Sequence, residues 1–165
     1  VRRGSGTYVV STTPMDLDPV GLGAVEDKMA LAMDLVNVRM ILEPGIAEMA
    51  AMNATARDVE RLRELCAVIE QKIETGENYI EEDIAFHTAV AKCSGNMVVE
   101  QLVPIIDTAV MMFVNVTHRK LTQETIMTHR AVTDAIAERD PMGAKSAMMM
   151  HMTFNRNMIK DMMKQ

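Results

Sequence analysis

Apolar residues recur every three or four positions through most of this chain, which is the spacing of one face of an α-helix. The longest regular series is Leu31, Leu35, Val38, Leu42, Ile46 and Met49. This series predicts a helix over residues 29–52. Pro44 lies inside it, and we expect a kink there because proline removes a backbone donor and its ring crowds the preceding turn.

Capping residues divide the following sequence into further helices. Thr55 and Asp58 form a capping pattern at a helix start, and Gly76 is a typical stop signal. Asp140 and Pro141 suit the N-cap and the first position of a last helix. The expected helices cover residues 55–75, 79–92, 96–117, 122–139 and 141–162, with a short, less regular one over 19–26. Because short connections between long helices favour antiparallel neighbours, we predict an all-α antiparallel bundle of six main helices plus this short N-terminal helix.

The first 14 residues have a different pattern. They contain β-forming residues around Gly4, Ser5 and Gly6 and end at Pro14. We interpret this segment as half of a β-hairpin followed by a linker. No later segment offers a pairing strand, so we expect the other half to lie outside this sequence. The chain is therefore divided into a head, residues 1–14, and one helical domain, residues 15–165.

Composition changes the picture of the core. Apolar residues make up 48% of the chain, but aromatic residues make up only 3%, and there are 18 Met and no Trp. We therefore expect flexible methionine side chains to fill gaps between the helices. The methionines are scattered along the chain rather than grouped near the histidines, which disfavours a thioether metal site.

Charge and cysteine usage exclude several classes of protein. The formal charge of −6 at pH 7 argues against nucleic-acid binding by this chain itself, because phosphate binding needs a basic surface. Cys66 and Cys93 fit neither a close metal-binding spacing nor a disulfide framework, so we expect a reducing, cytoplasmic location. The longest apolar run, residues 102–116, is interrupted by Pro104 and Asp107. We therefore expect no membrane partner.

Histidines give the chain its candidate chemistry. His129 and His151 lie eleven residues before and after Asp140, where one helix is expected to end and the next to begin. In an antiparallel hairpin the two side chains would meet about 16 Å from the turn, at roughly 1.5 Å per residue. Asp83 and His87 are four residues apart and share one face of a third helix. Three imidazoles and one carboxylate predict a site for one divalent transition metal, with zinc the first choice and nickel, manganese or iron the alternatives.

Two other interpretations remain open. A histidine on an apolar helix face is usually a core residue with a satisfied hydrogen bond, and a helical bundle with this site could instead be a metalloenzyme acting on a small carboxylate. No histidine here has a glutamate three positions before it, as Glu-x-x-His requires, and His-Glu-x-x-His does not occur. We therefore assign no catalytic residue and predict that the chain is not an enzyme. His118, beside Arg119 and Lys120, is expected at a solvated helix end.

Arg39 interrupts the apolar face of the first long helix, and Glu43 follows one turn later. An ion pair along the helix would account for both residues. Alternatively, the guanidinium points into the bundle and binds a ligand carboxylate through two hydrogen bonds. Asn155 lies one turn after His151 and offers a second polar contact. Arg39 and Asn155 are therefore the candidate contacts for a bound effector.

Three blocks of sequence carry a resemblance to a known family. They are Val38-Arg39-x-x-Leu42-Glu43-x-x-x-Ala47 with Ala50-Ala51, Asp83-x-x-Phe86-His87 with Ser94-Gly95-Asn96, and His129-x-x-Val132-x-x-Ala135-Ile136 with Asp140, Ala144 and His151. These blocks resemble the FadR C-terminal domain (FCD) of GntR-family transcription regulators, and the match covers nearly all of residues 15–165. The head segment from Arg3 to Val9 is similar to the closing wing strand of that family's winged-helix domain.

The resemblance implies a function that the spacing alone does not. The whole protein would be a dimeric bacterial transcription regulator that binds DNA through an N-terminal domain missing here, except for its last wing strand in residues 1–14. Residues 15–165 would be the effector-binding and dimerising half. Members of the metal-binding branch sense small organic or sugar acids, so Arg39 becomes the expected anchor of the acid. The expected metal ligands are Asp83, His87, His129 and His151.

Overall fold

The computed structural model describes residues 21–117 and 121–164, and this part of the chain forms seven α-helices and no strand. Their bounds are Lys28–Asn53 for α1, Ala56–Thr75 for α2, Ile80–Cys93 for α3, Met97–Glu100 for α4, Val103–Thr117 for α5, Thr122–Ala137 for α6 and Pro141–Met162 for α7. The predicted all-α bundle is confirmed. The proposed head, residues 1–14, and His118 lie outside the described residues.

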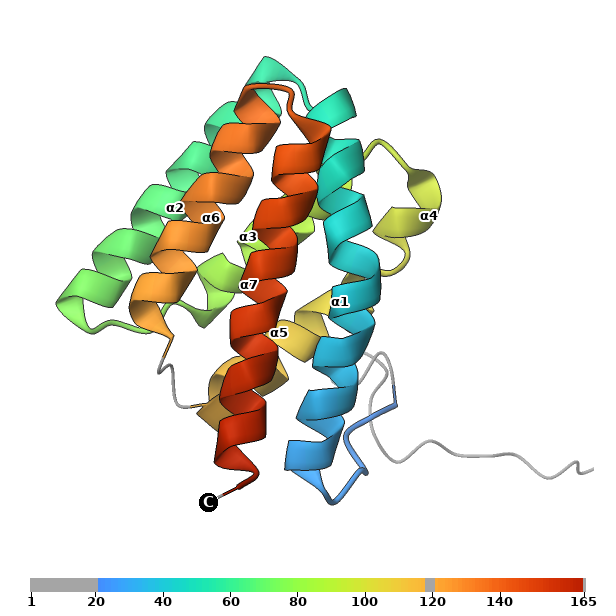
Figure 1. Cartoon of the computed structure of the whole chain (residues 1–165), viewed down its shortest axis with the longest axis vertical. Helices are drawn as coiled ribbons and strands as arrows, with labels where there is room; N and C mark the ends of the chain where they lie inside the picture. Colours follow the sequence, from blue (N-terminus) through green and yellow to red (C-terminus); the bar gives the residue numbers. More distant parts are fainter. Residues whose placement is uncertain (1–20, 118–120, 165) are drawn as a thin grey trace, which may run out of the picture.

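The helices form two layers. Figure 1 shows α2, α6, α7 and α1 side by side in that order, with α3 and α5 behind them. The most extensive contacts are those of α7 with α1 and α6, and α3 packs against α1, α2 and α5. The interior therefore lies between α1, α6 and α7 on one side and α3 on the other.

Side-chain caps determine where several helices begin. Asp27 accepts a backbone hydrogen bond at the start of α1, and Thr55 and Asp58 make both hydrogen bonds of a capping box at the start of α2. Asp140 accepts from the backbone N–H of Gly143 and caps α7. Each such cap stabilises its helix by about 1 kcal/mol. The helix starts predicted from Thr55 and Asp140 are confirmed.

The short helix expected over residues 19–26 is wrong in its described part. Residues 21–26 form turns and bends. Gly21 has a φ of 70°, in the left-handed region that a right-handed helix excludes. The first helix begins only after Asp27, whose carboxylate receives the N–H of Ala30 at 2.9 Å. Residues 19 and 20 lie outside the described residues.

The single helix expected over residues 96–117 is also wrong, because two helices occupy this stretch. Asn96 caps α4 as expected, but α4 ends at Glu100, and α5 begins at Val103 with Pro104 at its second position. A proline inside a helix clashes with the carbonyl four residues earlier, whereas it fits the first turn. The chain therefore breaks the helix before Pro104. Helix α1, in contrast, continues through the buried Pro44, and the kink expected there stays a prediction.

Aliphatic and methionine side chains fill the interior. Met148 and Met152 are fully buried, in agreement with the expected role of methionine as a core residue. Other methionines are not: Met52, Met97 and Met142 are 53%, 82% and 63% exposed. The largest fully buried apolar side chains are Phe86, Leu62, Ile69, Ile106, Ile136, Met148, Met152 and Ile159.

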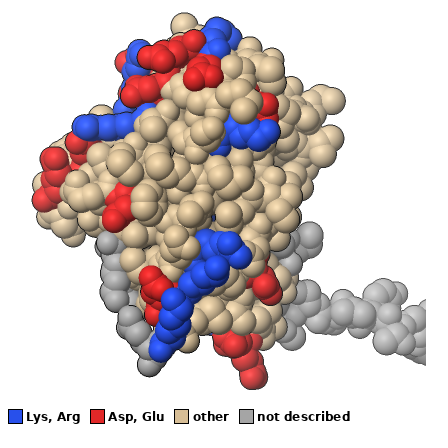
Figure 2. Space-filling view, viewed as in Figure 1, with Lys and Arg blue, Asp and Glu red and all other residues tan. Residues whose placement is uncertain are grey.

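Ion pairs on the surface link neighbouring helices. Lys145 Nζ on α7 lies 2.7 Å from Glu48 Oε2 on α1, and Lys72 Nζ on α2 lies 2.6 Å from Glu82 Oε1 on α3. On the face shown in Figure 2, Lys and Arg side chains lie among Asp and Glu side chains rather than in one basic patch. None of the described helices is both long and apolar enough to cross a membrane.

Candidate functional site

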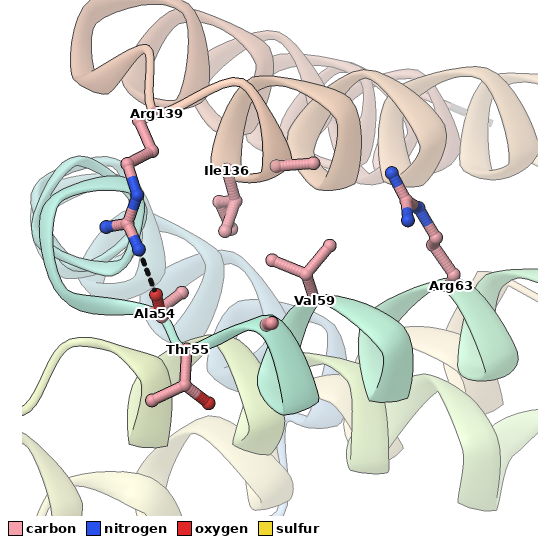
Figure 3. Close-up of a pocket in the computed structure, with 8 residues that line it drawn as sticks. Ala54, Thr55, Val59, Arg63, Ile136 and Arg139 are labelled. Atoms are coloured by element: carbon pink, nitrogen blue, oxygen red, sulfur yellow. Dashed lines mark hydrogen bonds between the residues drawn. The ribbon is translucent and has the colours of Figure 1, made fainter.

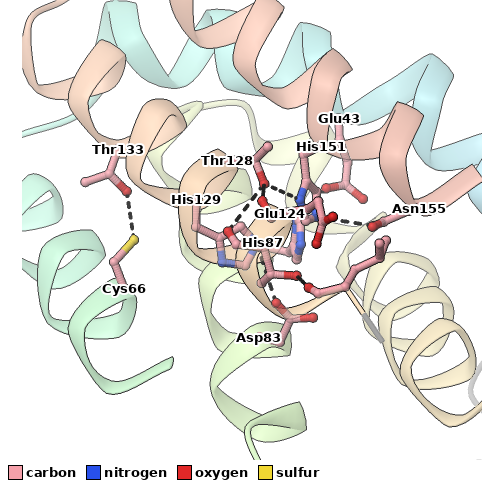
Figure 4. A network of polar contacts seen from close by, with 12 residues as sticks. Glu43, Cys66, Asp83, His87, Glu124, Thr128, His129, Thr133, His151 and Asn155 are labelled. Carbon is pink, nitrogen blue, oxygen red and sulfur yellow. Dashed lines mark hydrogen bonds and ion pairs between the residues drawn. The ribbon is translucent and has the colours of Figure 1, made fainter. Parts of the chain in front are cut away.

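Three histidines from three helices meet inside the bundle (Figure 4). His87 on α3, His129 on α6 and His151 on α7 are 2%, 1% and 3% exposed. One ring nitrogen from each can be chosen so that all three lie within 4.8 Å of one another, close enough to hold one metal ion. The structure thus brings together the three histidines that the sequence singled out.

The α6–α7 hairpin brings two of these rings to the same level. Arg139 has a φ of 55° in the turn that precedes Asp140, and the two helices then run antiparallel. The ring centroids of His129 and His151 lie 4.7 Å apart. Val132 and Met148, which follow and precede these histidines by three residues, are fully buried and belong to the same apolar core cluster. Equal spacing from the turn therefore produces the meeting of these two side chains.

Asp83 lies one turn before His87 on α3 and faces His129. Its Oδ1 is 3.5 Å from His129 Nε2, and the Asp83 residue is 6% exposed. Asp83 Oδ1 and both ring nitrogens of His129 are buried without a hydrogen-bond partner. A buried polar atom without a partner costs about 1–3 kcal/mol, and three such atoms gather here. A cation bound between the two side chains would give the oxygen and one nitrogen a partner, so these residues fit a metal ion.

Arg39 and Glu43 reach this site from α1. The Arg39 side chain is 2% exposed, forms an ion pair with Glu43 and places Nη2 3.0 Å from His87 Nε2. Glu43 Oε2 lies 2.6 Å from His87 Nδ1. Both interpretations of Arg39 therefore apply in part, because it pairs along the helix and also points into the bundle. The sequence identified Glu43 only as a partner of Arg39, and its contact with His87 was missed.

His151 has hydrogen-bond partners on both ring nitrogens. Its Nδ1 lies 2.8 Å from Thr128 Oγ1, and its Nε2 lies 3.3 Å from Asn155 Nδ2. Asn155 thus lies at the site, as its position one turn after His151 suggested. Thr128 was missed, and the available signal was its place beside His129 on the buried face of α6. Phe86, also missed, stacks on His129 with ring centroids 4.1 Å apart.

Burial determines the protonation of these groups. It lowers the pKa of His129 well below the ordinary value of 6.5, and the nearby His87 and Arg39 lower it further. The pKa of His151 is lowered in the same way, first by burial. Both histidines are therefore neutral at pH 7, which is the form that binds metal ions.

The two buried carboxylates differ in their pKa values. Burial raises the pKa of Asp83, and the charges of His87 and Arg39 only partly oppose this. Burial also raises the pKa of Glu43, but Arg39 and His87 more than compensate and hold it below the usual range. Glu43 is therefore an anion at neutral pH.

A pocket at one end of the bundle is separate from the histidines (Figure 3). It has a volume of about 320 Å³ and lies between the start of α2 and the end of α6. Arg139 at its edge donates hydrogen bonds to the carbonyl oxygens of Met52 and Ala54, at 3.1 and 2.9 Å. This arginine therefore joins the α6–α7 turn to the end of α1.

Cys66 also lies apart from the histidines (Figure 4). Its Sγ is 3.2 Å from Thr133 Oγ1. Burial raises the pKa of the Cys66 thiol to about 11, so it is protonated at pH 7. A protonated thiol is neither a good nucleophile nor a good metal ligand.

The fold and this internal centre define an all-α domain whose polar site is built from side chains on facing helices, an arrangement in which bundles hold ions and small ligands. Residues 34–154 match the family model of the FCD domain. The chain belongs to this family, which is the FCD domain of GntR-type transcription regulators.

Individual relatives agree with this assignment. The chain is 29% identical over 154 residues to the uncharacterized HTH-type transcriptional regulator YcbG of Bacillus subtilis, covering 86% of this chain and 62% of that protein. It is 28% identical over 175 residues to a putative L-lactate dehydrogenase operon regulatory protein of Escherichia coli, covering 96% and 65%. Among solved structures, Streptococcus agalactiae GntR is similar with a TM-score of 0.76 and 34% identity, covering 95% of this chain and 73% of that one.

The relatives also bear on the class of protein. The chain spans less than two-thirds of the length of the B. subtilis and E. coli proteins. By their printed names, the first is an uncharacterized transcriptional regulator and the second a putative regulatory protein, in agreement with the prediction that this chain is not an enzyme.

Proposed function

We propose that this domain senses a small carboxylate effector through one bound divalent transition metal, and that it controls DNA binding by a longer regulator. The observation that carries the proposal is the group of partnerless buried atoms on Asp83 and His129, beside two further histidines. These atoms cost free energy in the metal-free domain. An ion at this position removes that cost for the oxygen and for one of the two nitrogens.

The proposed ligands of the ion are Asp83, His87, His129 and His151. Imidazole and carboxylate donors suit zinc first, and nickel, manganese or iron as alternatives. The low pKa values of His129 and His151 support this assignment, because neither ring must lose a proton before it binds the ion at pH 7. When bound, the ion supplies a positive charge that attracts a carboxylate.

Arg39 and Asn155 are the proposed contacts of the effector. Each directs a donor nitrogen toward the histidines, at 3.0 Å from His87 and 3.3 Å from His151. A guanidinium binds a carboxylate through two parallel hydrogen bonds, and an amide adds a single donor. By its name, one relative regulates an L-lactate dehydrogenase operon, which is in keeping with a small organic acid as the effector.

The whole protein is proposed to act in the cytoplasm as a homodimer that binds DNA through an N-terminal domain. This chain carries a net charge of −6, so it is unsuited to binding phosphates by itself. A dimer with two-fold symmetry requires a palindromic operator. The effector changes operator affinity only if it binds the DNA-competent and DNA-incompetent arrangements unequally.

Metal content and thermal stability test the metal assignment. Purified domain should contain close to one transition-metal ion per chain, and His129→Ala or His151→Ala should lose most of it. His118→Ala is the matched control, because it removes the one histidine outside the proposed site and should leave occupancy unchanged. Equal occupancy in all three variants would show that the ion binds elsewhere.

A screen of small organic acids tests the effector assignment. An acid that binds the metal-loaded domain should stabilise it by about 2.7 kcal/mol at a hundredfold excess over its dissociation constant. Chelation of the metal should remove this effect. An acid that stabilises the metal-free domain equally well does not use the ion. For the full-length regulator, a gel-shift titration with and without that acid measures whether operator affinity responds.

A further inference from the structure

We propose that Thr128 and Glu43 are positioning residues that keep the ring protons of His151 and His87 on Nδ1, so that both histidines present Nε2 to the metal. This inference rests on the proposed metal site, but it concerns two residues that do not themselves bind the ion. Each of the two residues can only accept a hydrogen bond from the ring nitrogen that it contacts.

Thr128 has one hydroxyl proton, and its direction is decided by a backbone carbonyl. Thr128 Oγ1 lies 2.6 Å from the carbonyl oxygen of Glu124 and 2.8 Å from His151 Nδ1. A carbonyl oxygen can only accept, so the hydroxyl proton points to Glu124. The Thr128 oxygen must then accept from His151 Nδ1–H. The other ring nitrogen, Nε2, therefore keeps its lone pair.

Glu43 acts on His87 in the same way. Its Oε2 lies 2.6 Å from His87 Nδ1, and its ion pair with Arg39 identifies it as a carboxylate, which can only accept. His87 Nδ1 must therefore carry the proton. Glu43 is in turn fixed by the buried ion pair with Arg39. A carboxylate behind a histidine ligand orients the ring and makes the opposite nitrogen more basic.

The contact on the opposite side of the His151 ring agrees with this assignment. Asn155 Nδ2 lies 3.3 Å from His151 Nε2, and an amide nitrogen only donates, so this contact requires a lone pair on Nε2. An acceptor on Nδ1 and a donor on Nε2 thus define the same tautomer of His151 twice. Arg39 Nη2 lies 3.0 Å from Nε2 and 3.3 Å from Nδ1 of His87, so it does not select a nitrogen, and the assignment for His87 rests on Glu43.

His129 provides an internal comparison. Asp83 Oδ1 lies 3.5 Å from its Nε2 but makes no hydrogen bond with it, and Nδ1 has no partner either, so no hydrogen bond fixes where its proton lies. We therefore expect a single tautomer for His87 and His151 and no such restriction for His129.

The donors on Nε2 also suggest how metal and effector are coupled. If Nε2 of His87 and of His151 held the ion, Arg39 Nη2 and Asn155 Nδ2 would no longer have these lone pairs as acceptors. A carboxylate effector would supply acceptors to both groups, and the ion would supply a positive charge that attracts it.

Thr128→Val tests the role of the hydroxyl with little change in side-chain volume. Without the acceptor, the His151 proton can move to Nε2 and donate to the amide oxygen of a rotated Asn155, which blocks the lone pair. We expect zinc affinity to fall about 10- to 100-fold, the range for loss of a group that orients a metal ligand. Thr128→Ser keeps the hydroxyl and should restore wild-type affinity.

Thr125→Val is the matched control. Thr125 is buried on the same helix and donates to the carbonyl oxygen of Leu121, as Thr128 does to Glu124, but among the described residues its hydroxyl makes no hydrogen bond to a histidine. This variant loses the same kind of helix hydrogen bond and should bind zinc like the wild type. Zinc affinity is measured by competition with a chromophoric chelator, and the imidazole tautomers by ¹⁵N NMR of the metal-free domain at pH 8.

The outcomes separate this inference from the proposed function. A wild-type domain that binds no zinc overturns both. If the wild type binds zinc, an unchanged affinity in Thr128→Val, or a His151 proton on Nε2 in the wild-type spectrum, overturns the positioning role alone. A fall in affinity confined to Thr128→Val, with His151 changing tautomer and Thr128→Ser behaving like the wild type, supports it.

Discussion

Replacing His129 with leucine should make the metal-free domain more stable. His129 is 1% exposed, and neither ring nitrogen has a hydrogen-bond partner. Each orphaned atom costs about 1–3 kcal/mol, whereas the lost stacking on Phe86 contributes only about 0.5–1.5 kcal/mol. His129→Leu fills a similar volume without polar atoms, so removing two orphaned atoms and losing the stacking should give a net stabilisation of roughly 0.5–5.5 kcal/mol. At roughly 2–4 °C per kcal/mol for a domain of this size, the melting temperature should rise by at least about 1 °C.

His151→Leu is the informative contrast. His151 has partners on both nitrogens, so its removal leaves the Asn155 amide without its acceptor. We expect this variant to be less stable than the wild type by about 1–3 kcal/mol. The two histidines lie at equal distances from Asp140 in the sequence. The same substitution at each should therefore shift the stability of the metal-free domain in opposite directions.

Thermal and urea unfolding at pH 8 in the presence of a chelator measure both shifts. Added zinc should stabilise the wild type and neither variant, so His129→Leu should be the more stable protein without metal and the less stable one with saturating metal. The reasoning is refuted if His129→Leu melts below the wild type in chelator, because the nitrogens of His129 would then have partners in the metal-free domain.

Three further predictions concern the stability of the metal-free domain and involve Arg39, the buried histidines and the cap of α7. Arg39→Met should cost about 3–5 kcal/mol in urea unfolding, because Glu43 is left as an uncompensated buried charge, and adding Glu43→Met should recover most of that loss. The metal-free domain should lose stability as the pH falls below 6.5, by up to about 1.4 kcal/mol per pH unit for each of the two histidines with lowered pKa values, since the unfolded chain then takes up protons that the folded one does not. The raised pKa of Asp83 acts in the opposite direction, so urea midpoints are compared at pH 8 and pH 5.5 in an Asp83→Asn background. Gly143→Ala should cost about 1 kcal/mol in the same assay, because its Cβ would lie 2.3 Å from Oδ2 of Asp140 and displace the carboxylate that caps α7.

Local signals in the sequence predicted most of the helices. The starts of α2 and α7 were found because a capping residue and an apolar period agree at each, at Thr55 and Asp140. The prediction of one helix over residues 96–117 was wrong because apolar residues continue across the break between α4 and α5. Their helical spacing was given more weight than the restriction that Pro104 places on the backbone before it. In that case the backbone chemistry of one residue was the stronger effect.

In the candidate site, too, the contacts that depend on local spacing were predicted, and those that depend on helix packing were missed. His129 and His151 were paired by their distance from the turn, and Asp83 and His87 by one helical turn, so both pairs depend on local geometry alone. The contacts of Glu43 and Thr128 depend instead on how α1 is rotated against α3 and α6 against α7. Such rotations follow from packing among many side chains, and no spacing in the sequence specifies them.

Burial of the centre also sets the speed of any exchange with solvent. Three histidines that expose 3% or less of their surface admit an ion or an acid only when the surrounding helices separate briefly. Such local openings are rare states whose population depends on the free energy of packing. Entry is then slower than the roughly 10⁵–10⁷ M⁻¹s⁻¹ typical of docking to an open surface. The response time of this domain would therefore be set by how often the helices around the histidines separate, and core substitutions far from the histidines should alter that time without altering equilibrium affinity in proportion.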